Sequence, residues 1–417
     1  MRTFHVALLL AVCFSLACGD ATGPEAVPTS WAQVVAGRAH ACGLTDHGVV
    51  FCWGDTTSGQ AGQPWGPVTS PRSVQADVTF TGIAAGGDTT CGVSGQGSLF
   101  CWGNNALGQA GDGTRLNSYQ PVAVAGGLEW STVSVGTYHV CGIDTQRRLH
   151  CWGGDRWSVA LGYPPFNDCT APRFEPTWPC SDTPIPDFSD GTYDWIEAGL
   201  YQTCAGTNGG NAVCWGTNDH GQLGATADRE CMSNDPLHIP SVACSPAPLA
   251  PEGASLSRIH PGTTHGCGLD TQGLILCWGG LRLNFGQIGN GSFDGSPTPV
   301  PVGAGGPYTA VYASHESDVR TFSCGIEQGG GARCWGGNRQ GQLGSGQSPP
   351  CGPGGLPCRD VPTAVGGNHS FQALALGAEF ACGLNTDREI LCWGTNAGGQ
   401  LGDGTQTSRS EPRRIGS

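Results

Sequence analysis

One pattern constrains the fold of this chain more than any other: two cysteines ten positions apart, followed at once by Trp-Gly. Its clearest copy runs from Cys382 to Cys392 and ends in Trp393-Gly394. The pattern occurs seven times, and successive first cysteines are 49, 50, 63, 63, 57 and 58 residues apart. Such a period is typical of propeller blades. The seven pairs are Cys42 with Cys52, Cys91 with Cys101, Cys141 with Cys151, Cys204 with Cys214, Cys267 with Cys277, Cys324 with Cys334, and Cys382 with Cys392.

The spacing within one unit predicts a β-hairpin with a disulfide between its strands. When the unit is folded about Asp387, Cys382 falls opposite Cys392, and Leu384 falls opposite Ile390. Side chains alternate between the faces of a strand, and directly opposed residues have Cβ atoms close to disulfide distance. The 70 glycines and 29 prolines, with no long stretch of helical period, also indicate an all-β protein.

The 22 cysteines indicate either an oxidising compartment or metal binding. Structural zinc requires closely spaced pairs or four converging ligands, which a lone pair ten positions apart does not supply. Only three units carry a histidine two residues before the first cysteine, namely His40, His139 and His265, so no ligand set repeats. Disulfides therefore fit better than zinc, and we predict no metal and no cofactor.

The N-terminus predicts export. Residues 1–17 combine Arg2 with a short apolar run that resembles a bacterial lipoprotein signal, in which Cys18 would become the lipid-bearing first residue. Ordinary signal-peptide cleavage nearby is the alternative. Residues 18–30 are predicted to form a flexible tether. We thus expect an exported protein, either anchored to the membrane of a bacterial cell envelope or secreted. Without Cys13 and Cys18 an even number of cysteines remains, and the six outside the hairpins form local pairs: Cys169 with Cys180, Cys231 with Cys244, and Cys351 with Cys358.

Two further strands are predicted for each repeat. A bulky residue, an aliphatic residue and usually a glycine precede each hairpin at regular spacing, as in Trp31, Val34 and Gly37. In most units a proline lies eight or nine residues before the bulky position, but the first unit lacks one there. A matching segment, Pro412 to Ile415, follows the last hairpin. We therefore predict that the C-terminal strand completes the blade begun by the N-terminal strand, which would remove the exposed edges.

The residues resemble the regulator of chromosome condensation repeat. In that family a hydrophobic strand, Trp-Gly-x-Asn and Gly-Gln-Leu-Gly follow one another, as they do here from Trp393 to Asn396 and from Gly399 to Gly402. The resemblance covers residues 31–417 and implies one domain, a seven-bladed β-propeller of four-stranded blades. The glycine-rich segments are interpreted as turns, because no strand and helix flank them as in a phosphate-binding loop.

The resemblance leaves the function open. The eukaryotic namesake is a nuclear nucleotide-exchange factor that also binds chromatin, whereas secreted bacterial members include propellers that bind and inhibit β-lactamases. A net charge of −14 and the absence of lysine argue against a nucleic-acid partner. Common catalytic motifs are missing from the sequence. The Gly-Asp-Gly segments at Asp112 and Asp403 lack the further acidic ligands of a calcium site and are interpreted as turns.

The candidate binding site lies where the repeats differ in length. Long insertions follow the glycine-rich turn in three units, at Tyr163–Thr183, Ala225–Ala247 and Ser345–Val361, and each contains one of the extra cysteine pairs. Aromatic residues in these connections could form a recognition surface. Capping of the blades is the alternative, and it is the preferred interpretation for Trp65. The candidate binding residues are Trp65, Trp157, Tyr163, Phe166, Phe174 and Trp178.

We therefore expect a monomeric binding or scaffold protein that presents a loop-rich face to a protein or polysaccharide. The alternative is a propeller enzyme, a lyase or glycan-acting hydrolase, with its site near the central axis. A purely structural surface protein is a third hypothesis. Histidine, aspartate and arginine side chains that converge in an axial pocket would favour the enzyme, whereas an open aromatic and acidic rim would favour binding.

Overall fold

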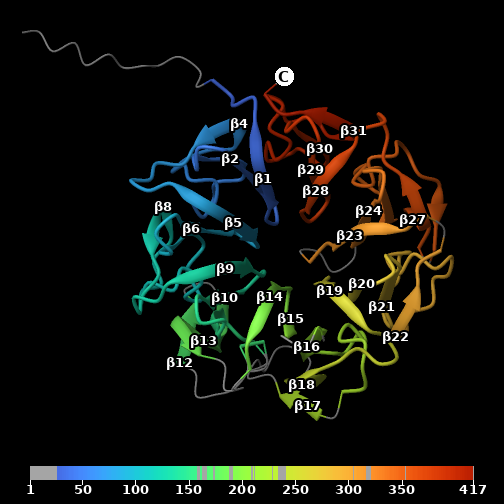
Figure 1. The fold of residues 1–417 in the computed structure, drawn as a ribbon, viewed down its shortest axis with the longest axis horizontal. Helices are drawn as coiled ribbons and strands as arrows, with labels where there is room; N and C mark the ends of the chain where they lie inside the picture. The colour runs from blue at the N-terminus through green and yellow to red at the C-terminus, as the bar shows by residue number, and fades with distance from the viewer. Residues whose placement is uncertain are drawn as a thin grey trace, which may run out of the picture.

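The computed structural model describes residues 26–156, 160–161, 167–171, 174–186, 191–207, 210, 212–227, 229–232, 241–303, 305–315, 321–352 and 354–416. Antiparallel sheets follow one another around a central axis, and the first strand of each sheet lies nearest that axis (Figure 1). All regular elements in these ranges are strands, so none of them offers a helix long and apolar enough to span a membrane. The predicted seven-bladed, all-β propeller with four-stranded blades is confirmed.

The strands divide into blades in chain order. Blade 1 contains β1 (Trp31–Ala36), β2 (His40–Thr45), β3 (Val50–Gly54) and β4 (Val68–Ser73), and blade 2 contains β5 (Phe80–Gly86), β6 (Thr89–Ser94), β7 (Leu99–Gly103) and β8 (Ser118–Ala123). Blade 3 contains β9 (Trp130–Val135), β10 (His139–Asp144), β11 (Leu149–Gly154), β12 (Asn167–Ala171) and β13 (Phe174–Pro186). Blade 4 contains β14 (Tyr193–Ala198), β15 (Gln202–Thr207), β16 (Ala212–Thr217), β17 (Arg229–Met232) and β18 (Ser241–Leu249).

The remaining blades repeat the arrangement. Blade 5 contains β19 (Leu256–Pro261), β20 (His265–Asp270), β21 (Ile275–Gly279) and β22 (Ser296–Pro301). Blade 6 contains β23 (Tyr308–Ala313), β24 (Phe322–Glu327), β25 (Ala332–Gly337), β26 (Pro350–Cys351) and β27 (Leu356–Ala364). Blade 7 contains β28 (Phe371–Leu376), β29 (Phe380–Asn385), β30 (Ile390–Gly394) and β31 (Arg409–Arg414).

One disulfide joins the second and third strands of every blade, as the spacing predicts. In blade 7 Cys382 lies directly opposite Cys392, and their Cα atoms are 4.1 Å apart. The other six hairpin pairs are formed in the same way, with Cα separations of 4.0 to 4.1 Å. In chain order they are Cys42 with Cys52, Cys91 with Cys101, Cys141 with Cys151, Cys204 with Cys214, Cys267 with Cys277, and Cys324 with Cys334. All seven predicted hairpin disulfides are therefore confirmed.

The insertions carry further disulfides. The predicted local pairs, Cys231 with Cys244 and Cys351 with Cys358, are both formed. Cys180 is disulfide-bonded, but the side chain of Cys169, its predicted partner, lies outside the described residues. Two of the three predicted insertion pairs are thus confirmed, and the pairing of Cys169 with Cys180 stays a prediction.

The predicted sharing of one blade by the N- and C-terminal strands is wrong. The C-terminal strand β31 pairs with β30 and completes blade 7, while β1 begins blade 1, which β4 completes. The proline-containing strand therefore belongs to the hairpin before it rather than to the hairpin after it. The reason is that β29 occupies one edge of β30 and leaves the other edge free. The chain that follows β30 turns back and pairs along this free edge as β31.

Side-chain packing closes the ring instead. Trp31 and Trp53 of blade 1 are buried in one cluster with Phe380, Ile390 and Leu401 of blade 7. The backbone N–H of Trp31 also donates a hydrogen bond to the carbonyl of Arg388 at 3.0 Å. Because burial of large apolar side chains is the main favourable term in folding, this interface can join the two ends without a shared sheet.

Neighbouring blades are also joined by the tryptophan of Trp-Gly. The Nε1 of Trp53 donates to the Gln400 carbonyl at 3.0 Å, from blade 1 back to blade 7. The backbone between these blades comes so close that a Cβ on Gly402 would lie 2.9 Å from the Trp53 ring, which explains a glycine at this position. Equivalent bonds to the preceding blade are Trp152 to Gln109, Trp215 to Ala160, Trp278 to Gln222, Trp335 to Gln287 and Trp393 to Gln342, at 2.8 to 3.1 Å.

Trp102 of blade 2 provides an internal control, since its Nε1 is buried without a hydrogen-bond partner. Trp393→Phe removes the donor for the Gln342 carbonyl and is expected to destabilise the protein more than Trp102→Phe, by about 1–2 kcal/mol, because only the former leaves a buried acceptor unpaired. Urea unfolding of the two variants measures the difference. Equal losses of stability would show that the indole hydrogen bonds contribute nothing beyond packing.

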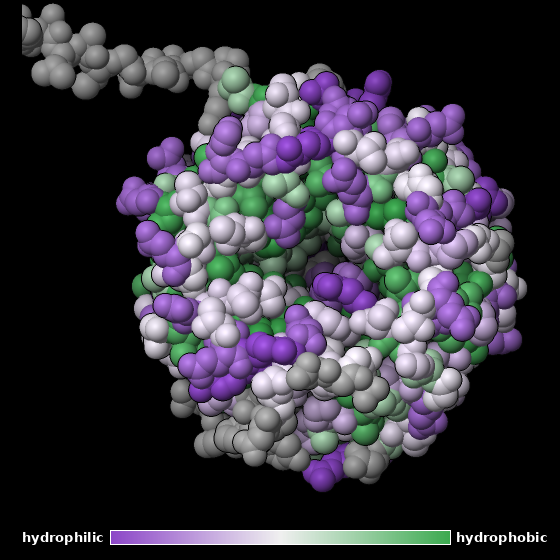
Figure 2. Space-filling model, viewed as in Figure 1, coloured by the Kyte–Doolittle hydropathy of each residue, from purple (hydrophilic) through white to green (hydrophobic). Residues whose placement is uncertain are grey.

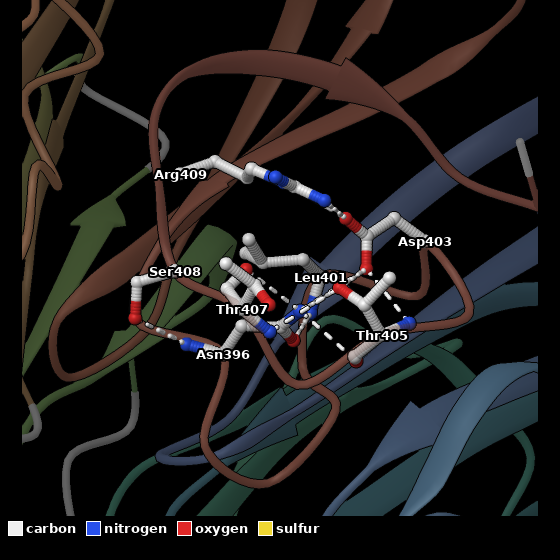
Figure 3. Close-up of polar contacts among 7 residues, drawn as sticks. All are labelled: Asn396, Leu401, Asp403, Thr405, Thr407, Ser408 and Arg409. Atoms are coloured by element: carbon white, nitrogen blue, oxygen red, sulfur yellow. Dashed lines mark hydrogen bonds and ion pairs between the residues drawn. The ribbon is translucent and has the colours of Figure 1, made fainter.

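The asparagine that follows Trp-Gly organises the next turn (Figure 3). The Asn396 amide donates to Asp403 at 3.1 Å and to the carbonyl of Thr405 at 3.0 Å, and its oxygen accepts from the Leu401 N–H at 2.9 Å. Arg409 of β31 forms an ion pair with Asp403 at 3.0 Å. The Gly-Asp-Gly segment at Asp403 is therefore a turn that fastens the outer strand, and the bonds of Asp112 in blade 2 follow the same plan.

Candidate functional site

The insertions lie on one face of the propeller. Neighbouring strands are antiparallel, so the connection after the first strand and the connection after the third strand of a blade open on the same side. We call this side the insertion face. The three insertions follow the third strands of blades 3, 4 and 6, and they add β12, β17 and β26 outside the fourth strands.

Two stacked tyrosines connect the insertions of blades 3 and 4. The rings of Tyr138 and Tyr201, each in the connection after a first strand, are 5.4 Å apart with an interplanar angle of 19°. Tyr138 packs against the buried Cys180, and Tyr201 packs against Cys244. The disulfide-bearing insertions therefore join the connections nearer the axis in one continuous part of the insertion face.

The candidate binding residues predicted from the sequence are only partly described. Trp65 lies in the third connection of blade 1 with 88% of its side chain exposed, so the interpretation that it caps the blade is wrong. Phe174 and Trp178 lie on β13, opposite Ala171 and Cys169, but their side chains are outside the described residues. Trp157, Tyr163 and Phe166 lie outside the described residues altogether, so a binding role for these five aromatic residues stays a prediction.

Exposed large apolar side chains gather on the segments that follow third strands. Among the described residues eight such side chains are exposed. Val49 and Leu274 lie in turns between second and third strands, on the opposite face. The other six lie in third connections or in the outer strands that these connections reach: Trp65, Leu116, Tyr119, Met232, Leu281 and Val361.

A second candidate site lies on the axis. A channel of about 790 Å³ is lined by the first strands of all seven blades, and Figure 2 shows the hollow at the centre of the ring. Because side chains alternate along a strand, the third and fifth residues of each first strand share one face, and all of them except Trp195 line the channel. In chain order these residues are Gln33, Val35, Gly82, Ala84, Thr132, Ser134, Trp195, Glu197, Arg258, His260, Ala310, Tyr312, Ala373 and Ala375.

Charged and aromatic side chains are unevenly distributed among these positions. Charged and aromatic side chains occur at them only in the three consecutive blades 4, 5 and 6. The other four blades supply only small, aliphatic or uncharged polar side chains. We call Glu197, Arg258, His260 and Tyr312 the channel cluster.

The channel cluster is held together by direct contacts. The Nη2 of Arg258 donates to the Oε1 of Glu197 at 2.5 Å, and the Nε2 of His260 lies 3.8 Å from the same oxygen. The His260 ring lies 5.0 Å from the Tyr312 ring. The guanidinium of Arg258 also lies over the Trp195 ring at 5.6 Å, within the range of a cation–π interaction.

Burial and neighbouring charges set the protonation of the cluster. Burial alone would raise the pKa of Glu197, but the charges of His260 and Arg258 and the hydrogen bond from Arg258 outweigh it and lower the pKa below its ordinary value. Burial lowers the pKa of His260, although Glu197 opposes the change. Burial also raises the pKa of Tyr312. At neutral pH the cluster therefore holds one carboxylate, one guanidinium, a neutral imidazole and a neutral phenol.

His315 links blade 6 to blade 3 across the channel. It lies in the connection after β23, and its carbonyl accepts a hydrogen bond from Thr137 Oγ1 of blade 3 at 3.1 Å. Blades 3 and 6 are not neighbours in the ring, so this contact crosses the axis on the insertion face. His315 lines the same channel, and it contributes to lowering the pKa of Glu197.

The sequence analysis placed the site in the insertions and did not find the channel cluster. A signal for it was present in the strand that precedes each hairpin. In blades 4 and 5 that strand carries Glu197, Arg258 and His260 at positions where blades 2 and 7 have glycine or alanine. Comparing the third and fifth positions across repeats would have revealed the difference.

The repeats themselves have recognisable relatives. A sequence profile of the "Regulator of chromosome condensation (RCC1) repeat" matches residues 31–60 and 80–109, and a second profile of the same description matches residues 96–143. Segments between residues 31 and 143 therefore carry the regulator of chromosome condensation repeat. The profiles match blades 1 and 2 and the beginning of blade 3, and the remaining blades of this repeat protein follow the same topology.

Curated relatives of the repeat protein match about half of it. The ultraviolet-B receptor UVR8 of Arabidopsis thaliana is 25% identical over 227 residues, which are 53% of this chain and 45% of the receptor. The human E3 ubiquitin-protein ligase HERC2 is 25% identical over 209 residues, which are 49% of this chain and 4% of the ligase. The matches thus span less than half the length of either relative.

Solved structures share the propeller. Prp20p from Saccharomyces cerevisiae, described with its binding to Gsp1p and histones, superposes with a TM-score of 0.69 at 19% identity and covers 90% of this chain and 87% of its own. Human WBSCR16 gives a TM-score of 0.69 at 17% identity, with coverage of 88% and 94%. The ectodomain of the Physcomitrella patens receptor kinase CR4 gives 0.52 at 20% identity, with coverage of 88% and 74%. At these identities the likeness shows the fold alone.

Proposed function

We propose that this repeat protein is an extracytoplasmic binding protein that presents its insertion face to a protein partner. The observation that carries the proposal is the concentration of exposed large apolar side chains on the segments that follow third strands, six of eight among the described residues. Aromatic and apolar side chains on a rigid scaffold give large contact area at a low entropic cost. A polysaccharide is the alternative partner.

The scaffold beneath this face suits a binding role. Nine disulfides among the described residues are typical of an oxidising, extracytoplasmic environment, where they rigidify hairpins and insertions alike. The net charge of −14 favours a partner with a basic surface. Prp20p, which shares the fold, binds the protein Gsp1p and histones, and this likeness supports a protein as the partner.

The proposal includes the location of the protein. We propose that residues 1–17 are a signal peptide, that Cys18 carries a lipid anchor in a bacterial cell envelope, and that the mature protein is a monomer. These N-terminal residues lie outside the described part of the chain. Mass spectrometry of the mature N-terminus should show an acylated Cys18, and an unmodified start further along the chain would contradict the anchor.

Affinity capture from the native envelope tests the binding face. The intact protein is compared with a variant in which Tyr163–Thr183 is replaced by a short Gly-Ser linker, and we expect this variant to lose most of the captured partner. The matched control carries Val49→Ser and Leu274→Ser, which remove exposed apolar side chains from the opposite face. The control should retain the partner, and recovery of the same proteins by the shortened variant would show that the binding face lies elsewhere.

The enzyme alternative has one observation in its favour, the convergence of Glu197, Arg258 and His260 on the channel. Glycoside hydrolysis ordinarily requires two carboxyl groups, and among the described residues that line the channel only Glu197 has one. A lyase that acts on acidic sugars requires a cation for the substrate carboxylate, whereas Arg258 is already paired with Glu197. The geometry therefore supports binding in the channel better than catalysis.

A further inference from the structure

The seven blades allow the channel cluster to be compared with equivalent positions in the same molecule. Two polar side chains in the other blades have a structural role, because they bond the backbone of the next blade. Gln33 donates to the carbonyl of Ile83 at 2.7 Å and accepts from its N–H at 3.0 Å. Ser134 Oγ accepts from the N–H of Ala198 at 2.9 Å. These bonds link a side chain of one first strand to the backbone of the first strand in the next blade.

Glu197, Arg258 and His260 do not follow this plan, since the hydrogen bond and ion pairs described for their side chains are with one another. The side chain of Arg258 is 51% exposed, and an ion pair of this kind contributes between zero and about 1 kcal/mol to stability. Partial burial of a carboxylate and an imidazole opposes that small gain. Stability of the ring therefore does not explain why blades 4 and 5 carry these side chains where blades 2 and 7 carry glycine or alanine.

The wall opposite the cluster leaves room for a ligand. Blades 7 and 2 contribute Ala373, Ala375 and Ala84, and a Cβ added to Gly82 would have no atom within 4 Å. The channel volume of about 790 Å³ falls within the range of roughly 300–1,000 Å³ that small-molecule sites occupy. The channel cluster therefore offers charged and polar hydrogen-bonding groups, and blades 2 and 7 offer small apolar side chains.

We propose that the central channel binds a neutral sugar, whose hydroxyl groups are held by Glu197, Arg258, His260 and Tyr312. The paired charges of Glu197 and Arg258 cancel, so neither an anion nor a cation finds an excess of opposite charge. A guanidinium has five N–H donors and a carboxylate about four acceptor positions, so both side chains keep capacity for hydroxyl groups after they pair. The alanine wall can contact the C–H groups of the sugar ring.

Neutrality of His260 suits the same ligand. A neutral imidazole offers one donor and one acceptor, and a hydroxyl group can satisfy either. A carboxylate ligand bound beside Arg258 would also lie close to the negative charge of Glu197. An ammonium ligand bound beside Glu197 would likewise lie close to the positive charge of Arg258, so each ligand would meet a repulsive charge. The channel lies apart from the exposed side chains of the insertion face, so this inference can fail while the proposed protein binding holds.

Isothermal titration of the oxidised protein tests the proposal, with glucose and N-acetylglucosamine as neutral probes and glucuronate as the anionic probe. At least one neutral sugar should bind with a stoichiometry of one, and Glu197→Gln and Arg258→Gln should each weaken it at least tenfold. The matched control is Arg147→Gln, which removes an exposed ion pair with Asp194; Asp194 lies on β14, as Glu197 does, but neither Arg147 nor Asp194 lines the channel. This control should bind as the unmodified protein does.

Thermal unfolding establishes that each variant is folded, and His260→Gln replaces any channel variant that is not. Absence of saturable binding for both neutral sugars would overturn the proposal, as would unchanged affinity in the folded channel variants. Glucuronate that binds more tightly than either neutral sugar, depends on Arg258 and gains affinity from Glu197→Gln would also overturn it, because the channel would then be a carboxylate site.

Discussion

Refolding of the fully reduced chain in dithiothreitol is expected to give no propeller, whereas refolding under oxidising conditions restores it. Each of the seven hairpin disulfides closes a loop of about eleven residues, for which loss of chain entropy in the unfolded state amounts to about 3 kcal/mol. Seven such bonds amount to about 20 kcal/mol, more than the roughly 5–15 kcal/mol by which whole domains are stable. The reduced chain should therefore remain unfolded.

Reduction must be carried out in denaturant, because the hairpin cysteines are buried. Circular dichroism and tryptophan fluorescence then follow refolding with and without reductant. The control replaces Cys231, Cys244, Cys351 and Cys358 by serine, which removes the two described insertion disulfides and keeps every hairpin bond. This control should refold under oxidising conditions. Native spectra from a chain with free hairpin thiols would contradict the expected dependence.

Acidification from pH 7 to pH 5 is expected to destabilise the protein by about 4 kcal/mol through two buried histidines. The Nε2 of His139 lies 2.9 Å from Thr203 Oγ1 in the next blade, and the Nε2 of His265 lies 2.8 Å from Ser323 Oγ. Burial lowers the pKa of His265 to about 3, and burial together with the charge of His315 lowers the pKa of His139 to about 3.

The direction of the effect follows from these pKa values. Both histidines stay neutral in the folded protein down to about pH 4, whereas in the unfolded chain they become protonated as the pH falls through about 6.5. Below pH 6.5 the unfolded chain binds protons that the folded protein does not, so stability falls as the pH decreases toward 3. The carboxylates with lowered pKa values, such as Asp403, lose their contribution only near and below pH 4, so the range from pH 6.5 to 5 isolates the histidines.

Substitution by glutamine tests this account, because blade 4 has Gln202 at the equivalent position and buries it fully. The variant with His139→Gln and His265→Gln should lose most of the pH dependence of its urea-unfolding midpoint between pH 7 and 5. His47→Gln at an exposed turn is the matched control and should keep it. An unchanged pH dependence in the double variant would mean that other groups control acid stability.

How well the sequence predicts a contact depends on how far apart the two residues are along the chain. Cys382 and Cys392 are ten positions apart, so strand alternation within one hairpin was enough to predict their disulfide. Sevenfold repetition of that hairpin, with the Trp-Gly and Gly-Gln-Leu-Gly motifs, then predicted a closed ring of blades. The Trp-Gly tryptophan also contributes beyond its own hairpin, but its partner, the Gln400 carbonyl for Trp53, lies in another repeat.

Contacts between repeats were decided by the tertiary structure. The sequence pattern did not show that β31 pairs with β30, because a proline-containing strand can be assigned to the hairpin on either side. It also did not show that Glu197 meets Arg258, 61 residues away, or that Thr137 meets His315, 178 residues away. The sequence alone thus determined the disulfide hairpin and its sevenfold repetition, since hydrogen bonding and side-chain alternation act over a few residues. The tertiary structure decided how the ring closes and which side chains meet in its channel, since those contacts exist only when separate blades surround one axis.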